Sequence, residues 1–476
     1  DLASRLRERQ TQKDDPDVLP RVELSDIPAE ISSPSPELHQ TDSTHYRYTA
    51  GTNGLIYQQW VSRLPTMTAT ELEHLPLATA LMAEVGVGDL DYLQTQDRHS
   101  ATVGALGASV SSRAHRDDEQ SSDSYFVLSS KALADKMDGQ LALMSDTLSS
   151  ARFDELSRIR DLVSQIRARR DQGITGSGHA LAMSAACAGM SPLARLGHEQ
   201  GGLEGIRRIR ALDDALADDG ELETLAASLS ALHQKLSQSG TPFLCTIADE
   251  PNLTAAAEAA LSAVISPTCA NTDTWQGSPI REVRREMWVT NTQVNFCARA
   301  YPTVPSGHPD APILSVLGAF LRNGYLHTSI REQGGAYGGG ASHDANIAAF
   351  RFFSYRDPRL VDTLADFDAS VRWLLEHTHD ALALEEAILS VISGLDKPGS
   401  PAGEAKRHFY ETLFGRTNEH RKHFRAGIVN TTLDDLKRVA ETYLRPECAS
   451  TAVVTHTAGA EALANSGITL TRQDLL

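Results

Sequence analysis

The chain has 476 residues, a formal net charge of −18, 41% hydrophobic residues and 22% charged residues. This length predicts two or three domains, and the composition is typical of a folded protein and not of a disordered or fibrous one. The acidic excess argues against nucleic acid as a partner, because phosphate binding needs a basic surface, and no apolar run is long enough to predict a membrane span.

The first forty residues resemble a linker more than a domain. Residues 1–15, "DLASRLRERQTQKDD", are typical of the end of a charged helix, and five prolines between Pro16 and Pro36 predict an extended connector. Because the chain begins without methionine and within a helix, we expect it to be part of a longer polypeptide. Because the true N-terminus is expected to be missing, the lack of a visible signal peptide says nothing about location, and the cytoplasm is only the default expectation.

The next segment predicts a β-α-β unit with a helical tail. Residues 45–64 are rich in aromatic and β-branched residues and predict strand, and apolar residues at helical spacing predict a helix over about 72–82. Two further strands are expected over 103–114 and 124–133, followed by a long helical region that ends near residue 210.

The same order of elements returns after residue 280. Residues 285–304 predict strand, and 310–324 predict a helix with Asp310 as N-cap and Gly324 just past its end. A glycine-rich segment, a strand at 346–354 and a helix follow. The apolar face of that last helix consists of Leu364, Phe367, Val371 and Leu374.

The two similar series of predicted strands and helices indicate an internal duplication offset by about 230 residues. "TNGLIYQQWVSRL" matches "NTQVNFCARAYPTV", "LPLATALMAEVG" matches "APILSVLGAFLRNG", and "GALGASVSS" matches "GGAYGGGAS". We therefore expect an α+β protein with two homologous domains, each a mainly antiparallel sheet covered by helices. The predicted parts are a connector at 1–40, a first domain at 41–238 and a second at 239–476.

The chain shows no sequence signature of a metal site or a catalytic serine. Neither H-E-x-x-H nor H-x-x-E-H occurs, the five cysteines form no C-x-x-C pair, and the pairs His377/His379 and His420/His423 are more typical of solvated helix surfaces. The glycines of "GITGSG" at 173–178 lack the strand and lysine of a phosphate loop, and a connector between helices is expected there.

The segment "SIREQGGAYGGGASHD", residues 329–344, combines an arginine, a tyrosine and five glycines. The glycines would let a peptide lie close to an edge strand, Tyr337 could donate a hydrogen bond to a carbonyl oxygen as it gains negative charge, and Arg331 could hold the peptide backbone. A glycine-rich hairpin with a packed tyrosine and an ion-paired arginine is the alternative that this pattern leaves open.

The duplication favours a functional role for the arginine and the tyrosine. The first copy keeps Gly104 and Gly107 at the positions of Gly335 and Gly338, but it has Leu106 at the position of Tyr337 and no arginine at the position of Arg331. The shared glycines are thus expected to be architectural, whereas the arginine and the tyrosine belong to one copy only.

These residues resemble the pitrilysin/insulinase metallopeptidases, the inverted zincins, and within them the presequence-protease group. The arginine and tyrosine of "REQGGAYG" resemble that family's C-terminal signature, and "TNGLIYQQWVSRL" and "DDPDVLPRVELSDIP" resemble segments of presequence-type enzymes. The resemblance covers nearly the whole chain.

The resemblance implies an oligopeptidase of four similar domains in two halves, which close around a short unstructured peptide. Zinc would be held by an inverted H-x-x-E-H helix in the N-terminal half, and this chain would be the C-terminal half, with no metal ligands of its own. Tyr337 and Arg331 would be catalytic, and Gly334 and Gly335 would bind the substrate.

Two alternatives to a C-terminal half of a zinc peptidase stay open. The chain could be a non-catalytic partner or assembly subunit of the same fold, or an unrelated peptide-binding module. In the preferred interpretation the partners are the N-terminal half and peptide substrates, and the chain alone is expected to be inactive because the zinc motif is absent.

Overall fold

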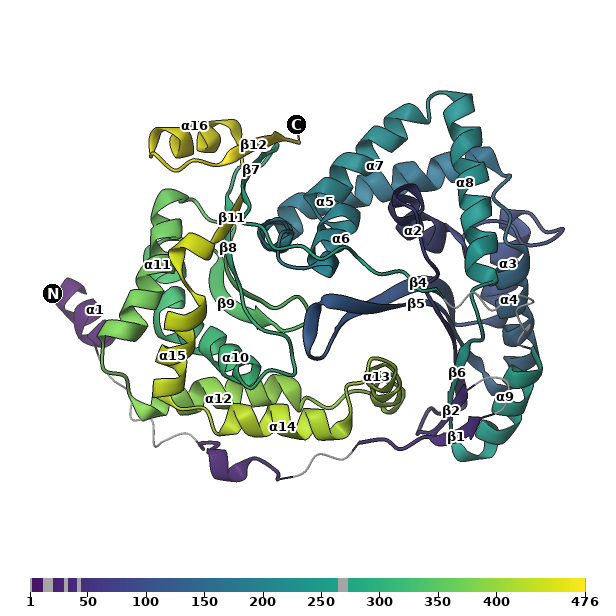
Figure 1. Ribbon diagram of the computed structural model, residues 1–476, viewed down its shortest axis with the longest axis horizontal. Helices are drawn as coiled ribbons and strands as arrows, with labels where there is room; N and C mark the ends of the chain where they lie inside the picture. The colour runs from purple at the N-terminus through teal and green to yellow at the C-terminus, as the bar shows by residue number, and fades with distance from the viewer. Residues whose placement is uncertain (1, 12–19, 30–32, 41–43, 264–272, 476) are drawn as a thin grey trace.

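The computed structural model describes residues 2–11, 20–29, 33–40, 44–263 and 273–475. Two six-stranded sheets lie side by side, each flanked by helices (Figure 1). No helix in the described ranges is long and apolar enough to cross a membrane. The prediction of an α+β protein with two sheet-based domains is confirmed.

The first sheet has the strand order β1-β2-β6-β3-β5-β4. Only β2 and β6 pair in parallel, and the other neighbours of this sheet are antiparallel. Its strands are β1 Glu37–Gln40, β2 Thr44–Thr49, β3 Leu55–Arg63, β4 Ala105–His115, β5 Asp118–Leu133 and β6 Phe243–Ala248. The helices of this part are α2 Ala69–Leu81, α3 Tyr92–Thr102, α4 Met137–Ser150, α5 Leu156–Cys187, α6 Pro192–Gly201, α7 Leu203–Ala215, α8 Asp219–Ser237 and α9 Glu250–Ala263.

The second sheet has the order β12-β7-β11-β8-β10-β9 and repeats this arrangement in every strand except the outer strand β12, which comes last in the chain whereas β1 comes first. Here β7 pairs in parallel with β11 and β12, and the rest of the sheet is antiparallel. Its strands are β7 Arg285–Val289, β8 Phe296–Pro302, β9 Gly338–Asp344, β10 Ala349–Tyr355, β11 Ser450–Thr455 and β12 Thr471–Asp474. Its helices are α10 Asp310–Leu321, a π-helix Arg322–Gln333, α11 Val361–Glu376, α12 Ala381–Leu395, α13 Pro401–Leu413, α14 Asn418–Val429, α15 Leu433–Tyr443 and α16 Thr457–Asn465.

The first sheet extends beyond the limits expected for its domain. β1 lies within the predicted connector, and β6 follows the predicted boundary at residue 238 yet inserts between β2 and β3. A strand that returns after a long helical excursion joins through non-local pairing, which leaves no local sequence signal. Residues 12–19 and 30–32 of the connector lie outside the described residues, and the rest contains α1 (Leu2–Thr11) and a short 3₁₀ turn at Leu24–Asp26.

Each sheet is also covered by a helix from the other half of the chain. The C-terminal part of α5 packs on the second sheet, where Ala182, Ala185 and Ala186 share one buried cluster with Trp288 and Phe296. Conversely, α13 lies between the two sheets (Figure 1), and its Phe409 is buried against Tyr46 and Tyr48 of the first sheet. The two sheets therefore stabilise one another through exchanged helices.

The helix expected over 310–324 does not end at Gly324. The chain passes directly from α10 into the π-helix, which runs to Gln333. Gly324 lies beneath Trp373, where a Cβ atom would overlap the indole ring, so this glycine is required by packing and not by a helix end. Asp310 is the first residue of α10 and binds Arg438, whereas Pro309 occupies the cap position.

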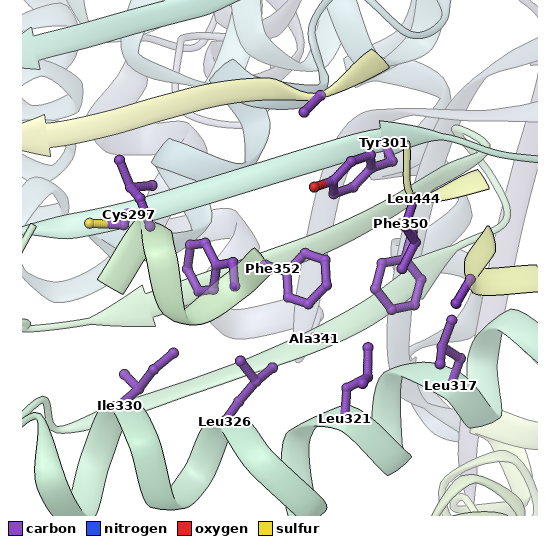
Figure 2. Close-up of a cluster of buried hydrophobic side chains, with 14 of the residues drawn as sticks. Cys297, Tyr301, Leu317, Leu321, Leu326, Ile330, Ala341, Phe350, Phe352 and Leu444 are labelled. Carbon is purple, nitrogen blue, oxygen red and sulfur yellow. The ribbon is translucent and has the colours of Figure 1, made fainter. Parts of the chain in front are cut away.

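The π-helix is anchored in the core of the second sheet. Figure 2 shows Leu326 and Ile330 of this helix directed toward Phe352 of β10, and all three side chains are fully buried. Because Ile330 points into the core, the next residue, Arg331, is turned toward solvent.

The connector predicted at Gly173–Gly178 is wrong, because α5 continues through it with non-helical backbone only at Ser177. Gly178 follows this kink, and a Cβ atom there would overlap the ring of Phe296. The glycine thus lets α5 approach the second sheet closely.

Candidate functional site

The arginine-tyrosine motif spans the end of the π-helix and the start of the edge strand β9. The N–H of Gly335 donates to the carbonyl of Arg331, and the N–H of Ala336 donates to the carbonyl of Ile330, which closes the helix end. The N–H of Tyr337 then donates to the carbonyl of Tyr355 at 3.1 Å, and β9 pairs with β10 from Gly338 onward. The expectation that these glycines lead into an edge strand is confirmed.

Gly334 and Gly335 are each required by the local backbone. A Cβ atom on Gly334 would overlap the guanidinium group of Arg359, and Gly335 has φ +79°, a conformation that disfavours side chains. These constraints explain both glycines structurally, and their contact with substrate stays a prediction.

Arg331 is exposed and carries no neutralising partner among the described residues. Its Nη1 lies 3.5 Å from Nε2 of His327, and the other ring nitrogen of that histidine lies 3.4 Å from Glu332. Among the described residues, Arg331 is therefore not ion-paired to a carboxylate, whereas the alternative of a purely structural hairpin predicts such a pair. The guanidinium is available for a ligand.

Tyr337 is also exposed, with 69% of its surface accessible. Its ring packs edge-on against Tyr355, with 5.6 Å between the ring centroids, and within the described part of the chain its hydroxyl has no hydrogen-bond partner. A packed tyrosine in a hairpin would bury its ring, so this geometry favours a hydroxyl that is directed outward to a ligand.

Tyr355 supports Tyr337 from below and is itself held by the first half of the chain. The ring of His179, on α5 just after the kink, lies 4.8 Å from that of Tyr355, and Phe296 lies 5.9 Å away. Burial lowers the pKa of His179, which keeps this imidazole neutral at pH 7. Helix α5 therefore contributes to the position of Tyr337.

The loop after β10 is hydrogen-bonded to the π-helix close to the arginine-tyrosine motif. Nη2 of Arg359 donates to the carbonyl of Ser329 and to Asp366, and the Asp357 carboxylate accepts from Thr363 and from the N–H of Arg359. Burial raises the pKa of Asp357, whose side chain is fully enclosed. This loop fixes the helix end from which Arg331 projects.

The strand register allows the two copies to be compared residue by residue. Gly338 pairs with Tyr355 in the second sheet, and Gly107 pairs with Ser129 in the first. The counterparts of Tyr337, Tyr355 and Arg356 are therefore Leu106, Ser129 and Ser130. Near the counterpart of Arg331, Arg98 is neutralised by Asp146 at 2.8 Å.

Sequence reasoning did not identify Tyr355, Arg356, Asp357 or Arg359 as part of this site. Their signal was the run "YRDPR" directly after a predicted strand, at the same edge of the sheet as the motif.

The described residues contain no group of three or more His, Cys, Asp or Glu side chains that could hold a metal ion. His379 forms a hydrogen bond with the carbonyl of Leu374 and packs on Trp373, and His423 is exposed on α14. Arg331 and Tyr337 therefore do not lie beside such a ligand group within the part of the chain that the structure describes.

The motif lies on an open surface and not in one of the larger cavities. A cavity of about 530 Å³ lies between Arg116 and α14, and another of about 550 Å³ lies on the other side of that helix. Neither is lined by Arg331 or Tyr337. A second surface would have to cover the motif to exclude water from it.

Comparison with known proteins identifies relatives of the chain. A family of domains described as associated with peptidase M16, subfamily C, matches residues 1–212, and the "PreP C-terminal domain" matches residues 285–457. The mitochondrial presequence protease of Yarrowia lipolytica is 28% identical over 453 residues, which cover 93% of this chain and 45% of that protein. The chain thus spans less than half the length of this relative.

Solved structures share the fold at lower sequence identity. A conserved protein from Enterococcus faecalis has a TM-score of 0.65 with 14% identity, and the match covers 89% of this chain and 99% of that one. A peptidase M16 inactive domain from Pseudomonas fluorescens has a TM-score of 0.63 with 15% identity, and the match covers 93% of this chain and 100% of that one.

Proposed function

Because the chain belongs to the M16 peptidases, as a C-terminal half of the presequence-protease type, we propose that it supplies Arg331 and Tyr337 to a peptide held at a zinc site in the N-terminal half. The whole protein would be an oligopeptidase that degrades short unstructured peptides in a closed chamber. Its partners would be the N-terminal half of the same polypeptide and the peptide substrate.

The proposal rests mainly on one observation, which is a difference between the edge strands of the two copies. Both copies place glycines at the start of an edge strand, but only the second adds an exposed, unpaired arginine and an exposed phenol to it. Architecture alone would not require either side chain, because the first copy has Leu106 at the position of Tyr337 and no arginine at that of Arg331.

Tyr337 would act on the carbonyl group of the scissile peptide bond. Its hydroxyl would donate a hydrogen bond to the carbonyl oxygen, and this bond strengthens as the oxygen becomes negatively charged in the transition state. Arg331 would hold a neighbouring peptide carbonyl with its planar guanidinium and so orient the substrate.

The edge strand β9 would contribute to substrate binding through its backbone. Its outer side is not paired with another described strand, and a Cβ atom added to Gly338 would have no other atom within 4 Å, so an extended peptide has room to approach there. This chain alone would not hydrolyse peptides, because the described residues contain no group of three or more His, Cys, Asp or Glu side chains that could hold the metal ion.

The proposal is tested by steady-state cleavage of a quenched fluorescent peptide by the complete two-half protein. Tyr337→Phe should lower kcat by about 10²- to 10³-fold with little change in KM, as expected for loss of one oxyanion donor. Leu106→Phe, the matched change in the first copy, should leave kcat within about twofold. Equal effects of the two variants would contradict the assignment, and an assembled protein without peptidase activity would favour the partner or assembly subunit.

A further inference from the structure

Arg356 has an unusual backbone conformation next to the motif. It directly follows β10, its φ is +49°, and its side chain is exposed. Few residues other than glycine adopt this left-handed conformation, and such strain concentrates at functional sites.

The guanidinium of Arg356 is held beside Tyr337 through a shared aromatic ring. It lies 5.3 Å from the centroid of the Tyr355 ring, and Tyr337 packs edge-on against the same ring. A cation over an aromatic face is held in place while its N–H groups remain free to donate.

No carboxylate neutralises Arg356 in the described part of the chain. The adjacent Asp357 is fully buried, and its two oxygens accept from Thr363 and from the backbone of Arg359. The nearby Arg359 and Arg351 are, by contrast, ion-paired with Asp366 and Asp344. The exposed side chain of Arg356 thus carries an uncompensated positive charge in a chain whose net charge is −18.

The first copy has nothing equivalent. Its strand register places Ser130 at the position of Arg356, and the Ser130 hydroxyl donates to the carbonyl of Ala105 within the same hairpin. The arginine, like Tyr337, is thus dispensable for the architecture.

We propose that Arg356, held over Tyr355, is a binding site for a carboxylate group of the peptide substrate beside Tyr337. The inference rests on the proposed function and deepens it, because it makes Arg356 a determinant of specificity. One position of the bound peptide would prefer an acidic side chain or the terminal carboxylate, bound by the guanidinium through paired hydrogen bonds.

The test is a set of quenched peptides in which one glutamate, or a glutamine at the same position, is moved along the sequence. The wild-type two-half protein should show a ratio of kcat/KM for glutamate over glutamine of about tenfold at one position, as expected for a charge-assisted hydrogen bond. A free C-terminal carboxylate is compared with an amide in the same way. In Arg356→Gln the ratio should fall to about one.

Two further variants separate a specific role from a structural one. Arg356→Lys should retain part of the ratio, because the charge remains while the paired donors are lost. Arg445→Gln, an exposed arginine on a distant loop, should leave the ratio unchanged. A glutamate preference that survives in Arg356→Gln would overturn the inference.

Equilibrium binding of the same peptides to this chain alone distinguishes the two proposals. If the assembled protein does not cleave, the proposed function fails, and fluorescence anisotropy then decides whether the glutamate peptide binds this chain more tightly and whether Arg356→Gln removes the difference. Absence of any glutamate preference in both cleavage and binding overturns the carboxylate site.

Discussion

The two sheets of this protein share the order of five of their six strands and differ in the side chains that they present at one edge. In both, the outer edge strand pairs with the next strand along the chain, yet Leu106, Ser129 and Ser130 of the first sheet are replaced by Tyr337, Tyr355 and Arg356 in the second. Residues that differ between the two sheets are not required for the shared fold. The candidate catalytic and binding residues, Tyr337, Tyr355 and Arg356, are among those that differ.

The first sheet is nevertheless not a passive copy. Helix α5 leaves it, passes the kink at Ser177, and places His179 beneath Tyr355, while α13 returns from the second half to cover the first sheet. The degenerate copy therefore acts as a support for the site in the other copy.

The largest expected effect is a loss of stability in acid that involves both sheets. Burial lowers the pKa of His45 in β2 and of His198, which packs on Trp288, to about 4. Because these folded-state pKa values lie below the usual 6.5, the stability they contribute is fully present above pH 6.5 and is lost as the pH falls toward 4. Each could contribute up to about 3 kcal/mol.

Urea unfolding at several pH values measures this contribution. The difference in unfolding free energy between pH 7 and pH 4.5 should shrink in His45→Gln and in His198→Gln relative to the parent chain. An unchanged pH dependence in either variant would show that the corresponding histidine does not titrate on unfolding.

Removal of Arg331 from the second copy should lower peptidase activity, whereas removal of an arginine from the corresponding region of the first copy should not. Arg331→Ala in the assembled protein should lower kcat/KM by about 30-fold, the effect of losing a hydrogen bond from a charged group. Arg98→Ala, which removes a half-buried arginine paired with Asp146, should leave kcat/KM within about twofold. Similar losses in both variants would contradict a special role for Arg331.

Filling the contact between α5 and the second sheet should destabilise the protein. Gly178→Ala places a methyl group against Phe296 and should cost about 1 to 3 kcal/mol of unfolding free energy. Gly176→Ala, two residues earlier with open space around it, should be neutral or stabilising by up to about 1 kcal/mol. Chemical denaturation compares the two variants, and equal midpoints would argue against close packing at Gly178.

The smallest expected effect concerns the turn before Tyr337. Gly335→Ala forces a side chain into the left-handed region and should cost about 1 kcal/mol, whereas Gly107→Ala, with open space around it in the first copy, should change stability by less than half of that. Thermal unfolding of both variants measures the difference. If Gly107→Ala proves the more costly, the glycines do not have the roles assigned here.

Local patterns predicted the repeated units and the edge strand because these depend on short segments. Strand alternation in β10, with Phe350 and Phe352 buried, and the glycines of β9 are visible in the sequence itself. The membership of β6 in the first sheet was not visible, because it depends on pairing with β2 and β3 across nearly two hundred residues.

The supporting residues of the site escaped prediction for a related reason. A positive φ at Arg356 has no sequence signature, since arginine does not favour it, and the contact between His179 and Tyr355 joins two halves of the chain. The continuation of α10 into the π-helix was likewise missed, because Gly324 resembles a helix end until its contact with Trp373 is known.

The central claim is that this chain provides half of a peptidase site, and a split-protein assay tests it most directly. The chain and the N-terminal half would be prepared separately and supplied with zinc, alone and mixed, with one quenched fluorescent peptide. The account predicts no cleavage by this chain alone and cleavage by the mixture that is greatly reduced by Tyr337→Phe. Zinc-dependent cleavage by the purified chain alone would contradict it.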